Sequence, residues 1–178
     1  MERWDGRVIL LHWSTAASVI LAFGAVWTRG EVDDRALRAT LLAIHRSAGL
    51  LALGLTLVRM VVRSRVSGPE HPLPRLQALA ARLMHIALYA LLAAQPMLGW
   101  AYSSARGQPI LLLGALPVPA LPWLGRGEVE MLGDAHATVG VLFLCCIGLH
   151  AAAGLYHGLI RRDGVAAAIL PQRRTRRA

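Results

Sequence analysis

The sequence predicts an all-α membrane protein, a bundle of four transmembrane helices with both chain termini in the cytoplasm. Three observations predict this fold. First, 56% of the 178 residues are hydrophobic and the mean hydropathy is +0.50, which is more apolar than the roughly 45–50% usage of soluble domains. Second, four apolar segments are each about 20 residues long or longer, enough to cross a hydrocarbon core of about 30 Å. Third, arginine is distributed unequally among the connecting loops.

The four predicted helices cover about residues 8–27, 41–62, 79–102 and 137–160. The first one could also be read as a cleaved signal peptide. Its apolar run exceeds the 7–15 residues of a signal-peptide core, and no clear small-residue cleavage site follows, so we interpret it as a helix. Pro96 predicts a kink in the third helix. We expect a single domain over residues 1–178 with a basic tail over 161–178, because the loops are too short to fold alone.

The charge of the chain indicates its topology. All 19 basic residues are arginine, and the net charge is +9. Arginine dominates the loop between the second and third helices and the C-terminal tail, whereas the other two loops mix arginine with Asp and Glu. Since basic loops stay in the cytoplasm, both termini and the middle loop are expected on the inside. The positive charge is explained by topology, so we expect no nucleic-acid partner.

Four histidines lie in the apolar segments, and each is followed one helical turn later by a small residue. The pairs are His12 and Ala16, His45 and Gly49, His136 and Gly140, and His150 and Gly154. A buried imidazole in a membrane is costly unless it has a function, and a small residue at i+4 on the same face leaves room for a flat ligand. Taken singly, each histidine could instead form a hydrogen bond between helices.

The predicted topology sorts these histidines by depth. His45 and His136 lie near the outer face, and His12 and His150 lie in the inner half of the membrane. His150 follows His136 by 14 residues, about 21 Å along a helix. Two depth-matched pairs predict two six-coordinate haems stacked along the membrane normal. Zinc is less suitable, because its ligands gather at one depth. No C-x-x-C-H motif is present, so the haems would be non-covalent, of type b.

Several other residues could support such a site. Arg46 could bind a haem propionate. Equally, its long side chain could extend to the membrane interface and keep the charge in water. Trp13 could line a quinone pocket or belong to an interfacial aromatic belt. His85 and His157 lie near the predicted inner haem, where either could donate a hydrogen bond to a propionate or a quinone, or could occupy an ordinary interfacial position.

The ordered motifs of this chain resemble those of the bacterial cytochrome b561 family. The stretches are L-L-H-W at 10–13, I-H-R-S-A-G at 44–49, R-G-Q-P at 106–109, H-A-T-V-G at 136–140 and G-L-H-A-A-A-G-L-Y-H at 148–157. The resemblance implies that His12, His45, His136 and His150 are the haem ligands and that His157 lies near a quinone. Arg75, in the inner loop, is a further hypothesis for the quinone site.

The resemblance also implies a function in the bacterial inner membrane. The short four-helix chain is most similar to family members that oxidise superoxide at the periplasmic face and reduce ubiquinone. The alternative is a cytochrome b subunit that relays electrons between a periplasmic dehydrogenase or hydrogenase and the quinone pool. A membrane scaffold without a cofactor would leave the four buried histidines unexplained.

Overall fold

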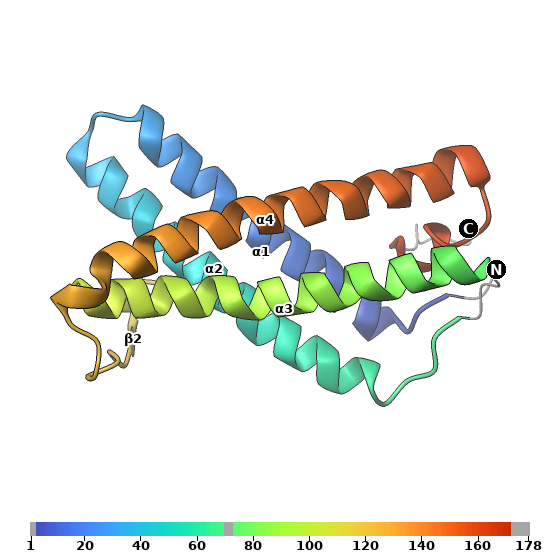
Figure 1. Cartoon of the computed structure of the whole chain (residues 1–178), viewed down its shortest axis with the longest axis horizontal. Coiled ribbons are helices and arrows are strands. Elements are labelled where there is room, and N and C mark those ends of the chain that lie inside the picture. Colours follow the sequence, from blue (N-terminus) through green and yellow to red (C-terminus); the bar gives the residue numbers. More distant parts are fainter. Residues whose placement is uncertain (1–2, 70–72, 172–178) are drawn as a thin grey trace, which may run out of the picture.

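A computed structural model describes residues 3–69 and 73–171 of the chain. It contains four long helices, α1 (Gly6–Glu31), α2 (Arg35–Arg63), α3 (Arg75–Ala105) and α4 (Val129–Leu155) (Figure 1). All four are long and apolar enough to cross a membrane. The predicted four-helix membrane fold is therefore confirmed.

Helices α1, α2 and α3 begin and end beyond the apolar runs from which they were predicted, whereas α4 begins before its predicted start at 137 and ends at Leu155, before its predicted end at 160. The Asp5 carboxylate accepts a hydrogen bond from the backbone amide of Arg7 (2.8 Å) and caps α1, and Asp34 caps α2 through the amide of Leu37 (2.7 Å). Such capping satisfies the first free amides of a helix and needs polar residues at its start. Since α4 begins at Val129, His136 lies about two turns inside this helix.

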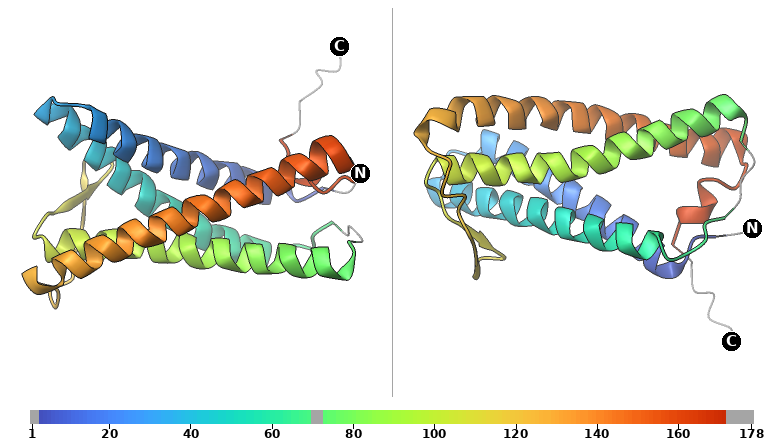
Figure 2. Two further views of the ribbon diagram at one scale, coloured as in Figure 1. Left: turned by 45° about the horizontal axis from the view of Figure 1, so that its top comes forward. Right: turned by 60° about the horizontal axis from the view of Figure 1, so that its bottom comes forward.

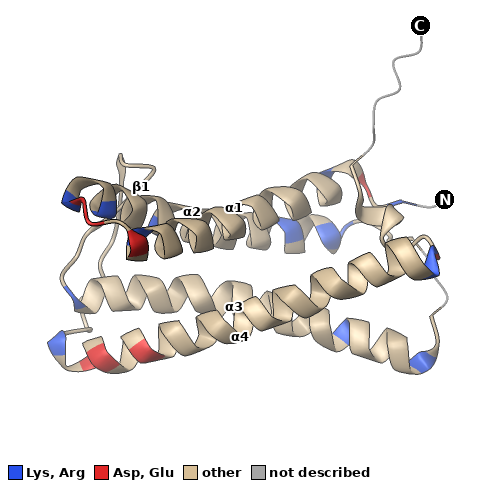
Figure 3. Cartoon of the chain, turned by 90° about the horizontal axis from the view of Figure 1, so that it is seen from above, with Lys and Arg blue, Asp and Glu red and all other residues tan. Residues whose placement is uncertain are grey.

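The bundle consists of two antiparallel helix pairs, α1 with α2 and α3 with α4 (Figures 2 and 3). The buried apolar residues of α1 and α2 are mostly small, and they include Ala22, Ala25, Ala48 and Ala52. Small residues let membrane helices approach closely. Charged residues gather toward the two ends of the bundle (Figure 3), as expected for helices whose middle lies in lipid.

A β-hairpin marks one end of the bundle, which we call the hairpin end (Figure 2). Strands β1 (Ile110–Leu112) and β2 (Leu116–Val118) pair antiparallel, with Ile110 opposite Val118. The hairpin is anchored to α2, because the backbone amide of Leu113 donates to Oγ of Ser47 (3.0 Å). The segment that follows β2 is anchored to α3, where the Trp100 indole donates to the carbonyl of Pro119 (2.8 Å). The chain between α3 and α4 therefore forms a fixed cap.

The other end, which we call the terminal end, holds the beginning of α1 and the last described residues. Beyond α4 the chain continues as a π-helical turn, η2 (Tyr156–Arg161), and then reverses at Arg162 and Gly164, which have positive φ angles of 51° and 89°. Residues 164–171, here named the C-terminal strap, include the short helix η3 (Ala167–Ile169).

The C-terminal strap is held against the start of the chain. The backbone amide of Trp4 donates to the carbonyl of Ala168 (3.2 Å), and the Trp13 indole donates to the carbonyl of Ile169 (2.9 Å). Ala168 is only 2% exposed. Part of the expected basic tail over 161–178 is thus an ordered strap, and residues 172–178 lie outside the described residues.

Candidate functional site

The four histidines singled out in the sequence form two pairs in space. The ring centres of His45 on α2 and His136 on α4 are 6.1 Å apart, toward the hairpin end. The ring centres of His12 on α1 and His150 on α4 are 6.3 Å apart, toward the terminal end. Each pair therefore joins one helix pair of the bundle to the other.

The spacing of both pairs fits one metal ion held between two imidazoles. A metal ion lies about 2 Å from each coordinating ring nitrogen, which places the two ring centres about 6 Å apart. The separations of 6.1 and 6.3 Å agree with this value. The rings of each pair are steeply inclined, at 89° for His45 and His136 and at 73° for His12 and His150.

Hydrogen bonds define the tautomer of the pair at the hairpin end. Nδ1 of His45 lies 2.8 Å from the carbonyl oxygen of Ala22, and Nδ1 of His136 lies 3.2 Å from the carbonyl oxygen of Gln95. A carbonyl oxygen only accepts, so each Nδ1 carries the hydrogen and each Nε2 keeps a lone pair. Metal-binding histidines in proteins are held in this way, with the second nitrogen donating to a carbonyl or carboxylate.

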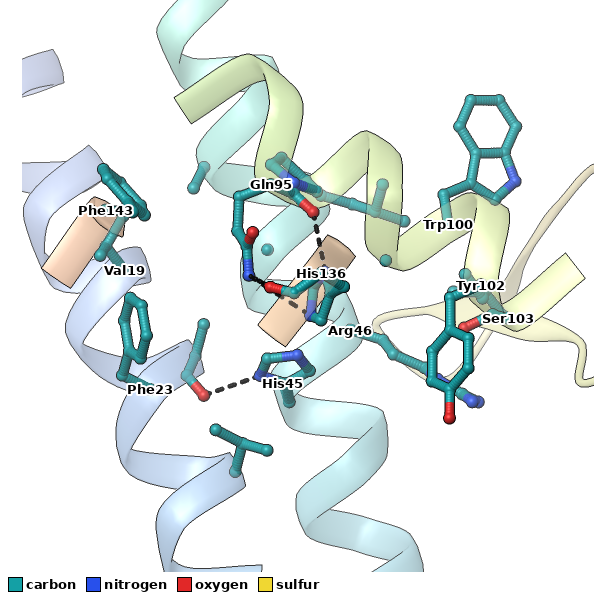
Figure 4. Close-up of a pocket in the computed structure, with 18 of the residues that line it drawn as sticks. Val19, Phe23, His45, Arg46, Gln95, Trp100, Tyr102, Ser103, His136 and Phe143 are labelled. Carbon is teal, nitrogen blue, oxygen red and sulfur yellow. Dashed lines mark hydrogen bonds between the residues drawn. The ribbon is translucent and has the colours of Figure 1, made fainter. Parts of the chain in front are cut away.

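A cavity of about 190 Å³ surrounds this pair (Figure 4). Its walls are mostly apolar and aromatic, and they include Phe23 from α1, Leu92 and Pro96 from α3, and Phe143 from α4. Gly49 also lines the cavity, and a Cβ built on it would meet no atom within 4 Å. An apolar cavity between two lone-pair imidazoles fits a haem, whose ring is flat and largely hydrophobic.

At the terminal end, His150 has a second histidine neighbour. The ring centre of His85 on α3 lies 5.5 Å from the ring centre of His150. The ring centre of His12 is farther from His150, at 6.3 Å. Nδ1 of His85 lies 2.6 Å from the carbonyl of Ala81, one turn earlier in the same helix. A Cβ built on Gly154 would meet no atom within 4 Å. Gly154, one turn after His150, thus leaves open space on α4, and His85 lies beside His150.

Arginines lie close to both pairs. Arg46 lines the cavity at the hairpin end and donates a hydrogen bond to Oε1 of Gln108. Arg106 is nearby and donates to the hydroxyl of Tyr102 (2.8 Å). Near the terminal end, the guanidinium of Arg59 lies 5.7 Å from the centre of the Tyr89 ring. Its Nε is buried and has no hydrogen-bond partner among the described residues.

The remaining predicted residues lie at the terminal end. Nδ1 of His157 is 2.6 Å from Oδ2 of Asp163. The ring of Trp13 is 5.3 Å from that of His12, while its indole nitrogen is bonded to the C-terminal strap. Arg75 is the first residue of α3 and is exposed, with no side-chain hydrogen bond or ion pair to any residue that the structure describes.

One contact of the site was not found by sequence reasoning. Gln95 contacts His136 with both its main chain and its side chain. His85 was expected near the inner pair, and its ring lies beside that of His150. A signal for Gln95 was present, because an amide beside a proline is unusual inside an apolar segment. Its partner, however, depends on how α3 and α4 are rotated against each other.

Comparison with known proteins supports a common family. The family model described as prokaryotic cytochrome b561 matches residues 3–172. The chain is 30% identical to "Cytochrome b561 homolog 1" of Escherichia coli (strain K12), over 98% of this chain and all of that protein. It is 27% identical to "Probable superoxide oxidase CybB" of Yersinia pestis, with 97% and 98% covered, and 31% identical to "Cytochrome b561 homolog 2" of Escherichia coli (strain K12), with 91% and 88% covered. The chain therefore belongs to the prokaryotic cytochrome b561 family, whose members are b-type electron-transfer cytochromes, and it is a multi-pass protein of the bacterial inner membrane.

Proposed function

We propose that this cytochrome holds two haems b, one between His45 and His136 and one between His12 and His150. The observation that carries the proposal is the pairing of these four side chains across the two helix pairs, at separations of 6.1 and 6.3 Å. The Nδ1 contacts of His45 and His136 with main-chain carbonyls support it, because they leave Nε2 free to coordinate iron. Residues 1–178 would then form one membrane domain.

The haems would supply single-electron transfer between the two ends of the bundle. The protein's own contribution is to orient four imidazoles and to exclude water with an apolar wall that includes Phe23 and Phe143. We place the hairpin end at the periplasmic face and the terminal end at the cytoplasmic face, because the arginine-rich loops belong on the inside.

The proposed donor is superoxide, which would be oxidised at the hairpin end. Each superoxide anion gives up one electron and becomes dioxygen. Arg46 lines the cavity there and has Arg106 nearby, and positive side chains attract an anion to such a site. The guanidinium of Arg46 is also suited to neutralise a haem propionate. The relative named a probable superoxide oxidase supports this donor.

The proposed acceptor is ubiquinone, which would bind at the terminal end. Two electrons and two protons convert one ubiquinone to ubiquinol, so two superoxide anions are needed for each quinone. His157, hydrogen-bonded to Asp163, is the residue we assign to the quinone carbonyl, because its imidazole can carry a proton. Trp13 beside His12 would supply an aromatic wall, and Arg75 a positive charge at the membrane surface.

A second candidate function is relay between a periplasmic redox subunit and the quinone pool. The cap at the hairpin end presents exposed apolar side chains, with Leu113 71% and Trp123 74% exposed. Clustered apolar side chains on a rim are typical of a docking surface. A partner subunit seated there would then replace superoxide as the donor.

The deciding experiment follows haem absorbance of the purified chain by stopped flow during a pulse of superoxide, with ubiquinone added later. We expect haem reduction near the diffusional limit of about 10⁸–10⁹ M⁻¹s⁻¹ and then reoxidation by the quinone. If superoxide does not reduce the haems but quinol still exchanges electrons with them, the relay function would be established instead.

A further inference from the structure

Gln95 contacts His136 through three pairs of atoms (Figure 4). Its main-chain carbonyl lies 3.2 Å from Nδ1 of the His136 ring. Its side-chain nitrogen Nε2 donates to the main-chain carbonyl of His136 at 3.0 Å and lies 3.4 Å from the ring nitrogen Nε2. One residue of α3 therefore restrains both the ring and the backbone of a histidine on α4.

The donors and acceptors in these contacts determine the protonation of the ring. The Gln95 carbonyl can only accept, so it requires a hydrogen on Nδ1 of His136. The Gln95 amide nitrogen also lies 3.4 Å from the ring Nε2, whose single lone pair a metal would use, so the bond it keeps with a metal bound is the one to the His136 main-chain carbonyl. The Nδ1 contact therefore selects the tautomer in which Nε2 has a lone pair for a metal.

Two glycines make room for this arrangement. A Cβ built on Gly99 would lie 2.9 Å from Cε1 of His136, so α3 can approach the ring only without a side chain there. A Cβ built on Gly140 would lie 2.9 Å from Nε2 of Gln95. Gly49, which follows His45 in the same sequence pattern, faces open space. The two glycines that follow His45 and His136 thus have different surroundings.

Packing alone does not explain a glutamine at position 95, because burying its amide is unfavourable. Its Oε1 is buried and has no hydrogen-bond partner among the described residues, which is unfavourable for a polar atom. Methionine would fill a similar volume without this cost. The hydrogen bond from the Gln95 side chain to the His136 main-chain carbonyl is therefore the property that a test should remove, since substitution leaves the Gln95 main-chain carbonyl in place.

We propose that Gln95 is a positioning residue for the ligand His136, and that Gly140 is small because it must admit the Gln95 amide. This inference rests on the proposed role of His136 as a haem ligand. It differs from the expectation that Gly140 only clears a flat patch for the haem. The Gln95 main-chain carbonyl fixes the tautomer of His136, and the Gln95 side chain acts through the His136 main-chain carbonyl by fixing the position of the ring. The orientation of a ligand tunes a coordinated metal.

The first test compares Gln95→Met with Met97→Leu, a matched control at an exposed position of α3. Haem content, the electron paramagnetic resonance spectrum of each ferric haem and both reduction potentials are measured on the purified full chain. We expect Gln95→Met to change the spectrum and potential of the hairpin-end haem and to leave the other haem as in the wild type. A Gln95→Met protein whose haem content, spectra and potentials all match Met97→Leu would overturn the proposal.

A double-mutant cycle tests the role of Gly140 and remains informative if Gln95→Met loses haem. We expect Gly140→Ala to displace the Gln95 amide, whose nitrogen the new Cβ would meet at 2.9 Å, and so to change the spectrum and potential of the hairpin-end haem in the same direction as Gln95→Met. In a Gln95→Ala background, Gly140→Ala should have no further effect, because no amide remains to be displaced. An equal effect of Gly140→Ala in both backgrounds would show that Gly140 serves the haem directly and would refute the proposal. Gly49→Ala is the control, with the same effect expected in both backgrounds.

Failure of the ligand assignment is distinguishable from failure of this inference. If His136→Ala retains the hairpin-end haem, His136 is not its ligand and both proposals fall. If His136→Ala loses that haem while the Gln95 variants and the cycle show no change, the role of Gln95 alone is wrong.

Discussion

Nδ1 of His157 lies 2.6 Å from Oδ2 of Asp163, and this hydrogen bond closes the turn that ends the fourth helix. The other carboxylate oxygen, Oδ1, accepts from the backbone amide of Val165 (3.3 Å). Between His157 and Asp163 the chain leaves the π-helical turn through Arg162, which has a positive φ. The pair thus connects the end of the bundle to the C-terminal strap.

Asp163 should make this end of the protein sensitive to acid. Partial desolvation alone would raise its pKa, but the hydrogen bonds from His157 and Val165 hold the pKa of Asp163 below its ordinary value. The folded carboxyl group therefore binds a proton less readily than the unfolded one. Its stabilising effect is present above the ordinary pKa of about 3.9 and is lost as the pH falls through the lowered value. Hydrogen exchange in residues 163–169 should rise over that range, and Asp163→Ala should raise it already at neutral pH. An unchanged exchange rate in Asp163→Ala, with Asp33→Ala as control, would contradict this.

Trp13→Phe should loosen the C-terminal strap. The substitution keeps an aromatic ring but removes the indole donor to the carbonyl of Ile169. A hydrogen bond of this kind contributes about 0.5–1.5 kcal/mol. Limited proteolysis and hydrogen exchange of residues 164–171 would measure the loss. Trp27→Phe, at an exposed position, is the control, and equal protection in both variants would show that the indole does not hold the strap.

The four ligand variants should separate the two haems. His45→Ala and His136→Ala are each expected to remove the haem at the hairpin end, and His12→Ala and His150→Ala the haem at the terminal end. Haem content and reduced-minus-oxidised spectra measure each loss. His85→Ala should keep two haems, because we assign His85 no bond to iron. Loss of the terminal-end haem in His85→Ala, with retention in His12→Ala, would exchange the roles of His12 and His85.

Arg46→Gln should slow the reaction with superoxide more than Arg46→Lys does. Both variants lose the guanidinium, but only the first loses the positive charge that attracts an anion. Stopped-flow rates at several ionic strengths should show a weaker salt dependence in Arg46→Gln, because screening acts on the charge. Arg35→Gln, at the exposed start of α2, is the control, because it removes one positive charge outside the cavity. Equal rates for Arg46→Gln and wild type would exclude a steering role.

Much of the fold is predictable because it follows from the properties of residues that are close together in the sequence. Four apolar runs of sufficient length predict four spans, since each helix satisfies its own backbone within lipid. The recurrence of His136 and His150 on one helix sets two depths by the fixed rise per residue. Helix ends were less predictable, because the capping residues Asp5 and Asp34 lie outside the apolar runs.

The sequence by itself determined the number of spans, the family resemblance and the two depths at which histidines occur. Only the tertiary structure decided that the Gln95 side chain donates a hydrogen bond to His136 and that the rings of His85 and His150 are in contact. It also decided that the C-terminal strap accepts a hydrogen bond from Trp13. Hydrophobic length and helical periodicity are properties of neighbouring residues. The rotation of one helix against another and the reversal of the chain after η2 depend on the packing of distant segments, which no local pattern encodes.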